Sequence, residues 1–283
     1  MTPTTNPTDE PLGAKAVRLG FVTAAQLDAA LDHQRQRLAR GKQHRLLGLL
    51  LVDEGFLSTD QLVSLVNGAD PGRFPLTTDA VALAARLSRS LDASNQVIMF
   101  SGVSDDDGAA EVASQVALTF ARMERGAVLL LDGDVRRASL HARFGIKQTP
   151  GFSDVLSGDR KIEEAVFSSS VRHLAVLPGG SAQPEQTKLL LSGPGELLIR
   201  QLREQYLFVV IHGPPMLRSP EGSLLAVRAD AVVTVLAAGR HTKEQLAQVK
   251  RLLDGLKVRS LGVVLTEKGR PLRSDQQPMA RSR

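Results

Sequence analysis

The chain has 283 residues, of which 42% are hydrophobic and 23% are charged; these values are typical of globular proteins and exclude global disorder. Its length favours one large domain and one smaller domain. Cysteine is absent, which excludes disulfides, thiolate nucleophiles and cysteine-bound metals. The chain also has a single tyrosine, Tyr206.

Charge and hydropathy bear on the partners of the protein and on its cellular compartment. Most of the net charge of +5 lies in residues 268–283, where five basic residues accompany one aspartate. We interpret residues 267–283 as a disordered basic tail and expect no nucleic-acid partner. The longest apolar runs are far shorter than the ~20 residues of a membrane-spanning helix. Residues 1–11 are acidic and lack the features of a signal peptide, so we expect a disordered N-terminus and a cytoplasmic protein.

Residues 12–66 contain an internal repeat. Three short motifs recur thirty-five residues later: Leu12-Gly13 as Leu47-Gly48, Gly20–Thr23 as Gly55–Ser58, and Gln26-Leu27 as Gln61-Leu62. Each copy predicts a helix, a turn at the glycine, an N-cap at Thr23 or Ser58, and a second helix with periodic apolar residues. We expect a small all-α domain of two helical hairpins that bury their leucine faces against each other.

The repeat pattern, LG-x6-G-x6-L-x3-L, resembles the N-terminal domain of type II secretion and type IV pilus assembly ATPases, and the first copy ends in that family's glutamine, Gln34. Some members of that family bind cyclic di-GMP through paired motifs with an arginine before each LG. Here Pro11 and Leu46 occupy those positions, and Arg45 is one place out of step. We therefore favour a docking module, with a cyclic di-GMP-sensing pilus or secretion adaptor as an alternative.

Residues 67–78 are rich in Gly, Pro and Thr and are interpreted as a linker. A helix is predicted over Asp79–Leu91, and apolar strands then alternate with helices. The candidate strands are Gln96–Ser101, Ala127–Leu131, Leu174–Leu177, Tyr206–Ile211, Ala231–Leu236 and Ser260–Leu265, and the clear helices are Ala109–Met123, Lys188–Glu204 and Lys243–Leu256. This pattern predicts an α/β domain over residues 79–266, with a mostly parallel sheet and helices on both faces.

The chemistry of such a fold lies in loops at the carboxyl ends of the strands. Five loops stand out: Ser101–Ala110, Asp132-Gly133-Asp134 with the following VRRASLHARFG, GFSDVLSG at 151–158, LPGG at 177–180 and HGPP at 212–215. In this order and spacing they resemble the cytoplasmic kinase domain of bacterial polysaccharide-export tyrosine kinases, which belongs to the MinD/ParA-like group of deviant P-loop ATPases. The resemblance implies a P-loop NTPase fold and, in active members, a site for Mg·ATP.

The first loop departs from that family. Aligned on Gly108, the P-loop lysine is replaced by Ala109 and the magnesium-binding Ser/Thr by Ala110. Three aspartates, 105–107, stand where upstream glycines are expected and would face a triphosphate with like charge. Each repulsion at ~4 Å is worth about 4 kcal/mol at an effective dielectric near 20. A P-loop presents backbone N–H groups and a lysine to phosphates, so we expect no ATP binding in the family manner and treat Gly108 as a remnant.

A second departure concerns the metal. The family's Walker-B aspartate is His212 here, whereas Asp132 and Asp134, which match the family's extra metal-binding pair, are retained. We favour a structural role for these carboxylates, as helix caps or as partners of Arg136 or Arg137. A remnant magnesium site is one alternative. A divalent metal held by the loop aspartates with Asp132 and His212 is another.

A third departure concerns phosphorylation and assembly. Kinases of this family end in a tyrosine cluster that neighbouring subunits phosphorylate, but residues 267–283 contain none, and Tyr206 begins a predicted buried strand. The family's ring interface uses a helical E-x2-R-x2-R motif. Here Arg86 and Arg89 match its arginines and are candidate interface residues, while the glutamate is Leu83. An ordinary solvated helix face is the alternative.

The sequence therefore predicts a two-domain pseudo-enzyme with no catalytic residue, no metal site and no cofactor. An active nucleotide-dependent switch or kinase, using ATP and magnesium with atypical ligation, is the alternative. The resemblance implies a regulatory or scaffolding role in exopolysaccharide synthesis and export. It further implies an inner-membrane chain-length or co-polymerase partner, and thus a peripheral place at that membrane. An active paralogous kinase and a second copy of this chain are further candidate partners.

Overall fold

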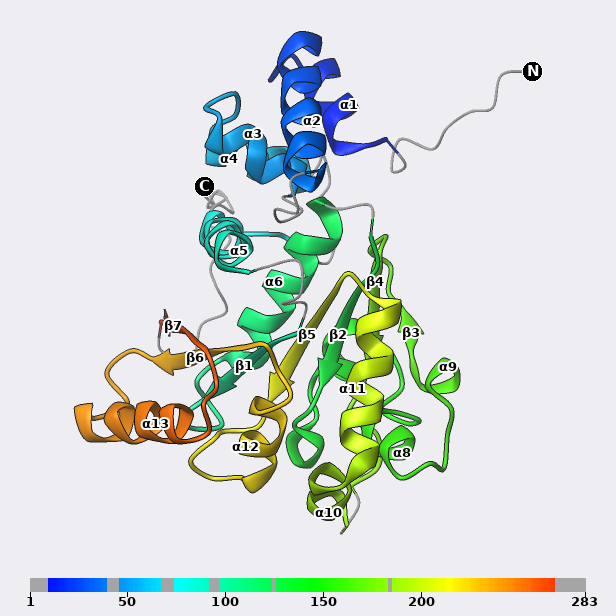
Figure 1. Cartoon of the computed structure of the whole chain (residues 1–283), viewed down its shortest axis with the longest axis vertical. Helices are drawn as coiled ribbons and strands as arrows, with labels where there is room; N and C mark the ends of the chain where they lie inside the picture. Colours follow the sequence, from blue (N-terminus) through cyan, green and yellow to red (C-terminus); the bar gives the residue numbers. More distant parts are fainter. Residues whose placement is uncertain are drawn as a thin grey trace, which may run out of the picture.

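The computed structural model describes residues 10–39, 46–67, 74–91, 97–123, 126–182 and 185–267. The predicted tail from residue 268, the first nine residues, Arg45 and positions 68–73 of the predicted linker lie outside the described residues. Figure 1 shows helices α1–α4 gathered at one end of the molecule, above a sheet that is flanked by the remaining helices. Among the described residues, no helix has the length and apolar character needed to cross a membrane.

The N-terminal repeat consists of α1 (Leu12–Arg18), α2 (Ala24–Ala39), α3 (Leu47–Asp53) and α4 (Thr59–Asn67). The predicted pattern of helix, turn, N-cap and helix is confirmed in both copies. The Thr23 hydroxyl accepts the N–H of Gln26, and the Gln26 side chain accepts the N–H of Thr23. Ser58 and Gln61 form the same pair of hydrogen bonds. These reciprocal capping boxes satisfy N–H groups that the first turn of a helix leaves without partners.

Glycines let the helices of the repeat approach closely. A Cβ atom on Gly13 would lie 2.7 Å from Cδ1 of Leu27, and one on Gly48 would lie 2.9 Å from Cδ1 of Leu62. Both distances are well inside the roughly 3.5–4.0 Å of normal carbon contacts. The Leu-Gly pair therefore recurs because each first helix must pack tightly against a leucine of the second. The repeat encloses its own small apolar cluster: Ala16, Val22, Ala30, Leu50, Leu51, Leu57 and Leu65.

A seven-stranded sheet follows, and it confirms the predicted fold class. Its strands are β1 (Val97–Gly102), β2 (Val128–Asp132), β3 (Phe167–Ser168), β4 (Leu174–Leu177), β5 (Phe208–Gly213), β6 (Ala231–Ala237) and β7 (Ser260–Thr266). Their order is β3-β4-β2-β5-β1-β6-β7, and every neighbouring pair is parallel except β3 with β4. The six predicted strands are all present. Strand β3 was missed because two residues carry no periodicity.

The sheet is covered by α5 (Thr78–Ser90), α6 (Ala109–Met123), α7 (Leu140–Phe144), α8 (Phe152–Leu156), α9 (Ile162–Ala165), α10 (Gln186–Leu191), α11 (Gly193–Gln205), α12 (Pro220–Ala226) and α13 (Lys243–Gly255), with a short 3₁₀ helix at Val135–Arg137. One prediction is wrong: the single helix over Lys188–Glu204 is two helices. Ser192 is extended between them, and Pro194 follows in the first turn of α11. Proline lacks the N–H that a continuous helix needs at that point.

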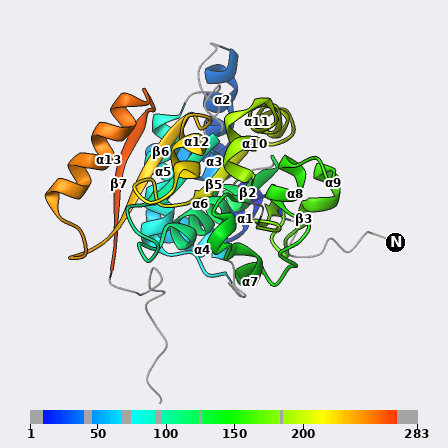
Figure 2. The same cartoon turned by 90° about the horizontal axis from the view of Figure 1, so that it is seen from below.

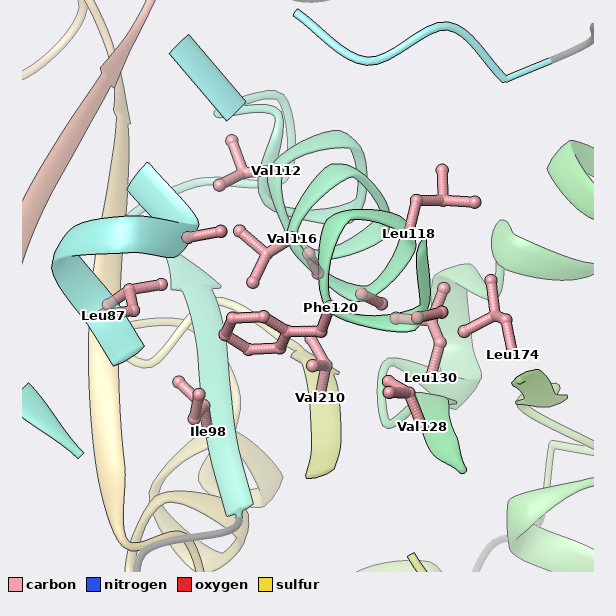
Figure 3. Close-up of a cluster of buried hydrophobic side chains, with 14 of the residues drawn as sticks. Leu87, Ile98, Val112, Val116, Leu118, Phe120, Val128, Leu130, Leu174 and Val210 are labelled. Atoms are coloured by element: carbon pink, nitrogen blue, oxygen red, sulfur yellow. The ribbon is translucent and has the colours of Figure 1, made fainter. Parts of the chain in front are cut away.

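Helices lie on both faces of the sheet (Figure 2), and an apolar layer packs on each face. Helices α5, α6 and α7 contribute to one layer, and α8 to α13 contribute to the other. Figure 3 shows the first layer, where Phe120 of α6 points to the strands near Ile98 and Val210. All three of these side chains are completely buried. Alternating strand residues therefore serve both layers, which explains the continuous apolar runs in the sequence.

The repeat packs on the α/β region through a shared core. Leu46, Leu62 and Val66 of the repeat belong to the same apolar cluster as Phe120. Asn67, the first residue of the predicted linker, is instead the last residue of α4. Its side chain accepts the N–H of Leu76 and donates to that residue's carbonyl. The proposed boundaries at 12–66 and 79–266 stay predictions, although the two parts pack together.

Candidate functional site

The candidate site lies where four neighbouring parallel strands end. In the order of the sheet, β2, β5, β1 and β6 are adjacent, so the loops that follow them meet at one edge. This edge faces α10 and α12, at the opposite end of the molecule from the repeat (Figure 1). The loop after β1, residues 103–108, is the one that resembles a phosphate-binding loop.

Asp107 anchors this loop from inside. Its Oδ2 accepts the N–H groups of Val103 and Ser104, at 2.8 and 2.7 Å. Its Oδ1 accepts the N–H of Ala237 at 3.0 Å and lies 2.6 Å from Nε2 of His241. Burial alone would raise the pKa of Asp107, but the hydrogen bonds from His241 and the backbone outweigh it and hold the pKa below its usual value. Our expectation that all three aspartates face a bound phosphate is therefore wrong for Asp107, which points into the protein.

The other two aspartates meet arginines from neighbouring loops. Oδ2 of Asp105 lies 2.5 Å from Arg137, which follows β2, and 3.1 Å from Arg218, which follows β5. Asp106 is 69% exposed and lies 3.4 Å from Arg240, which follows β6. The negative charge that we expected to repel a ligand is thus compensated within the protein. Only Asp105 combines partial burial with two guanidinium partners.

Residues 108–110, where the loop becomes α6, carry no side chain that could hold a phosphate or a metal. Gly108 has φ +81°, a conformation that glycine adopts without strain and that turns the loop into the helix. Ala109 is buried and Ala110 is half-buried, and both side chains pack against apolar residues of the α6 layer. The methyl groups of both residues therefore extend the apolar core up to the start of the helix.

Asp132 and His212 form a buried pair at the ends of β2 and β5. They are register partners on adjacent parallel strands, so their side chains lie on the same face of the sheet. Oδ1 of Asp132 is 2.9 Å from Nδ1 of His212, which donates because a carboxylate can only accept. Oδ2 accepts the N–H groups of Ser139 and Leu140 at the start of α7. The capping role that we favoured for Asp132 is thus seen at the start of α7, but its side-chain partner is His212, not Arg136 or Arg137.

Asp134 and Glu221 are two buried carboxyl groups whose pKa values move in opposite directions. Asp134 caps the short 3₁₀ helix by accepting the N–H of Arg137 at 3.3 Å. Burial raises its pKa, reinforced by nearby Asp132 and only partly opposed by His212. Burial would also raise the pKa of Glu221, but the hydroxyls of Ser219 and Thr187, with Arg136, hold it at about 2.

These loops enclose a hollow of about 200 Å³. Its lining includes Asp105, Asp134, Arg136, Arg137, Arg218 and Glu221. Gly133 can lie in its wall only as glycine, because a Cβ atom there would be 2.7 Å from Leu225 and 3.1 Å from the His212 carbonyl. The hollow is thus lined by three cationic and three acidic side chains.

A divalent-metal site built from the loop aspartates, Asp132 and His212 finds no support in this geometry. Asp132 and His212 do contact each other, but Asp107 turns away to His241. Within the described ranges, no three His, Asp or Glu side chains are arranged to hold a metal ion.

The loops GFSDVLSG and LPGG are joined to each other rather than to the hollow. Asp154 accepts the N–H of Gly151 and lies 3.3 Å from the N–H of Ser181, while Phe152 donates its N–H to the carbonyl of Pro178. A Cβ atom on Gly151 would lie 2.3 Å from the backbone nitrogen of Gly180. The glycines of both motifs therefore allow two loops to cross in contact.

No family model matches the chain. The tyrosine-protein kinase YwqD of Bacillus subtilis is 31% identical over 179 residues, which are 63% of this chain and 75% of that protein. The chain belongs to the bacterial tyrosine-protein kinase family. The tyrosine-protein kinase wzc of Salmonella typhimurium is 28% identical over 62% of the chain, which spans 24% of that longer protein. The kinase domain of Escherichia coli ETK shares the fold, with a TM-score of 0.62 and 22% identity over 71% of this chain and 80% of that chain.

The other residues singled out in the sequence are Arg86, Arg89 and Tyr206. Arg86 and Arg89 are both exposed on α5, and Arg89 lies 2.7 Å from Asp53 of α3. The acid that Arg89 meets is thus in the same chain. Tyr206, predicted to begin β5, instead follows the last residue of α11 as its C-cap and donates its N–H to the carbonyl of Leu202. It is half-buried, and burial raises the pKa of its hydroxyl.

Four site residues escaped sequence reasoning: Arg218, Glu221, Arg240 and His241. Each follows a strand by several residues and has no motif of its own in this chain. The one available signal was topological, because each of these residues follows β5 or β6, whose ends adjoin the end of β1.

Proposed function

We propose that this chain is a catalytically inactive member of the tyrosine kinase family that acts by docking, as a regulator or scaffold of exopolysaccharide synthesis and export. The observation that carries the proposal is the position of Asp107. A phosphate-binding loop works because its backbone N–H groups are free to meet phosphate oxygens. Here the Asp107 carboxylate accepts the N–H groups of Val103 and Ser104.

The side chains around this loop also do not fit Mg·ATP. Ala109 and Ala110 offer no ammonium for the β- and γ-phosphates and no hydroxyl for magnesium. The Asp132 carboxylate already accepts hydrogen bonds from His212 and from two backbone N–H groups, and a histidine at position 212 brings no negative charge to a metal ion. Loss of the lysine removes a positive charge, and Asp105 adds a negative one beside the hollow. We therefore propose that the protein needs no nucleotide, metal or other cofactor.

The proposed partner is an inner-membrane polysaccharide chain-length or co-polymerase protein, which would bring this chain to the cytoplasmic side of that membrane. An active paralogous kinase is a second proposed partner. Both proposals come from the family. Their support is that the chain has a seven-stranded sheet covered by helices, and a scaffold can act through such a fold without catalytic residues.

If a second copy of the chain docks, we propose that it contacts Arg86 rather than Arg89. Because Arg89 already pairs with Asp53 and both are partly exposed, Arg86 is the better candidate for an acid on another subunit. The N-terminal repeat is proposed as a docking module. Its likeness to pilus and secretion ATPases, and cyclic di-GMP binding with it, stays a prediction.

Calorimetric titration of the full chain with Mg·ATP, Mg·ADP and cyclic di-GMP tests the proposal, with YwqD as the positive control for the first two. We expect no heat of binding from any of the three ligands. Micromolar binding of Mg·ATP would contradict the inactive-kinase proposal and favour a nucleotide switch that uses Asp132 and Asp134. Cyclic di-GMP binding that is lost when Arg45 or Gln34 is replaced by alanine would favour the secretion-adaptor alternative.

A further inference from the structure

The hollow beside the altered loop has a cationic rim. The guanidinium-bearing side chains of Arg136, Arg137 and Arg218 are 71%, 57% and 65% exposed. The carboxylates that they contact lie deeper, with Asp105 21% and Glu221 only 4% exposed. A solute that enters from the solvent therefore meets the arginines before it meets the acids.

The three arginines of the rim do not each have a carboxylate partner of their own. Arg136 pairs with Glu221, while Arg137 and Arg218 share the single carboxylate of Asp105. Asp106 is 3.9 Å from Arg137 and lies closer to Arg240. Asp134, the remaining acid in the lining, accepts the backbone N–H of Arg137. The three guanidinium groups thus make their side-chain pairs with only two of the carboxylates in the lining.

The shape of the hollow suits a small multivalent anion. Each guanidinium has five N–H donors, and a contact with one carboxylate leaves others for a second acceptor. Arginine binds carboxylate and phosphate oxygens with the same fork of donors, so either group can satisfy it. The hollow of about 200 Å³ also includes Ser219 and Gln186 in its wall. An inorganic phosphate or pyrophosphate offers more acceptor oxygens to these arginines than the one carboxylate that Arg137 and Arg218 now share.

We propose that this hollow binds a phosphate-type inorganic anion through Arg136, Arg137 and Arg218, and that Asp105 is a tethered competitor for two of these arginines. The inference deepens the proposed function and rests on it, because it assumes that the loop itself no longer holds a nucleotide. When the anion binds, Asp105 gives up Arg137 and Arg218. The loop stays anchored by Asp107, whose contacts are to β6 and to the loop's own backbone.

The test is titration of the full chain with inorganic phosphate and with pyrophosphate at constant ionic strength, followed by calorimetry and by ³¹P NMR line width. D105N removes the competing charge and keeps the size of the side chain. We expect it to bind the better of the two anions about tenfold more tightly than the natural chain does, and R218Q to bind about tenfold more weakly. R137Q should behave like R218Q.

Two matched controls accompany these variants. R160Q changes an exposed arginine that pairs with Glu164 and does not line the hollow. D106N changes the exposed neighbour of Asp105. Both should leave the affinity within about twofold, and thermal melting reports whether each variant is folded. If neither anion binds the natural chain or folded D105N, or if R218Q and R137Q bind as well as the natural chain does, the proposal is overturned. Equal affinity of D105N and the natural chain overturns the competitor role of Asp105.

A parallel titration with Mg·ATP separates this inference from the proposed function. Micromolar Mg·ATP binding that R218Q leaves unchanged contradicts the inactive-kinase proposal, and this inference falls with it. If neither Mg·ATP nor either anion binds, the anion site is contradicted and the inactive-kinase proposal stands.

Discussion

Nε2 of His241 lies 2.6 Å from Oδ1 of Asp107, and the two side chains are 6% and 0% exposed. This contact joins the loop after β1 to the residues that follow β6. Because a carboxylate only accepts, Nε2 of His241 carries the proton. The same carboxylate also accepts hydrogen bonds from three backbone N–H groups, so one side chain holds the loop in its conformation.

Replacement of Asp107 is expected to be strongly destabilising. In D107A, the buried N–H groups of Val103, Ser104 and Ala237 and the ring of His241 lose their acceptor. Each buried donor left without an acceptor costs roughly 1–3 kcal/mol. Urea unfolding followed by far-ultraviolet circular dichroism measures this loss. D106A is the control and should change the free energy of unfolding by less than about 0.5 kcal/mol; equal losses in the two variants would show that the loop is not anchored in this way.

Stability should fall in acid because of Glu221. Its pKa is lowered from 4.5 to about 2 in the folded protein, so its contribution is complete above pH 4.5 and is lost as the pH falls towards about 2. The shift corresponds to roughly 3 kcal/mol at 1.36 kcal/mol per pKa unit. Asp107, whose pKa is also lowered, acts in the same direction. E221Q should be less stable at neutral pH and show a flatter fall between pH 4.5 and 2; an unchanged slope would contradict the assignment.

Asp134 should act in the opposite direction. Its pKa is raised by burial, so the folded state binds a proton more readily than the unfolded state does, and its charged form at neutral pH costs stability. D134N keeps an oxygen to cap Arg137 and removes that charge. We expect D134N to melt above the natural chain at pH 7, and the difference to shrink as the pH falls and Asp134 becomes protonated. A variant that melts lower at pH 7 would mean that the carboxylate is needed in its charged form.

The sequence predicts the fold well because its signals are long and periodic. Helix α6 was predicted with its observed ends, Ala109 and Met123, since a glycine precedes it and its apolar face is continuous. The split at Ser192 was missed because the leucines on either side keep helical spacing across the break. The capping boxes at Thr23 and Ser58 were predicted as N-caps because the whole motif recurs in the second copy.

The candidate site was only partly predictable. Ala109 and His212 could be singled out from the sequence because each occupies a position in a motif that the resemblance defines. The direction in which each aspartate points is not. Asp105 and Asp107 are two residues apart, yet one meets arginines at the surface and the other a buried histidine. Only the order of strands brings Arg218 and His241 to the same loop, and strand order depends on long-range packing.

The glycine of the second repeat provides a test of packing. In G48A the new Cβ atom would lie 2.9 Å from Cδ1 of Leu62, which is completely buried, and 3.2 Å from Cδ2 of Leu12. Overpacking of this kind costs typically about 1–3 kcal/mol, which exceeds the ~1 kcal/mol that alanine gains over glycine in a helix. G193A is the matched control, because nothing lies within 4 Å of its Cβ position.

The same variant tests whether the repeat and the sheet unfold as one unit. Leu62 and Val66 of α4 belong to the cluster that contains Phe120 of α6, so strain at Gly48 reaches the core of the sheet. Two regions that share buried contacts lose stability together, and a single cooperative transition is the signature of that coupling. We expect G48A to lower the midpoint of one urea transition followed by circular dichroism, with no early phase. Separate unfolding of the helical repeat, with the later transition unmoved, would contradict a shared core.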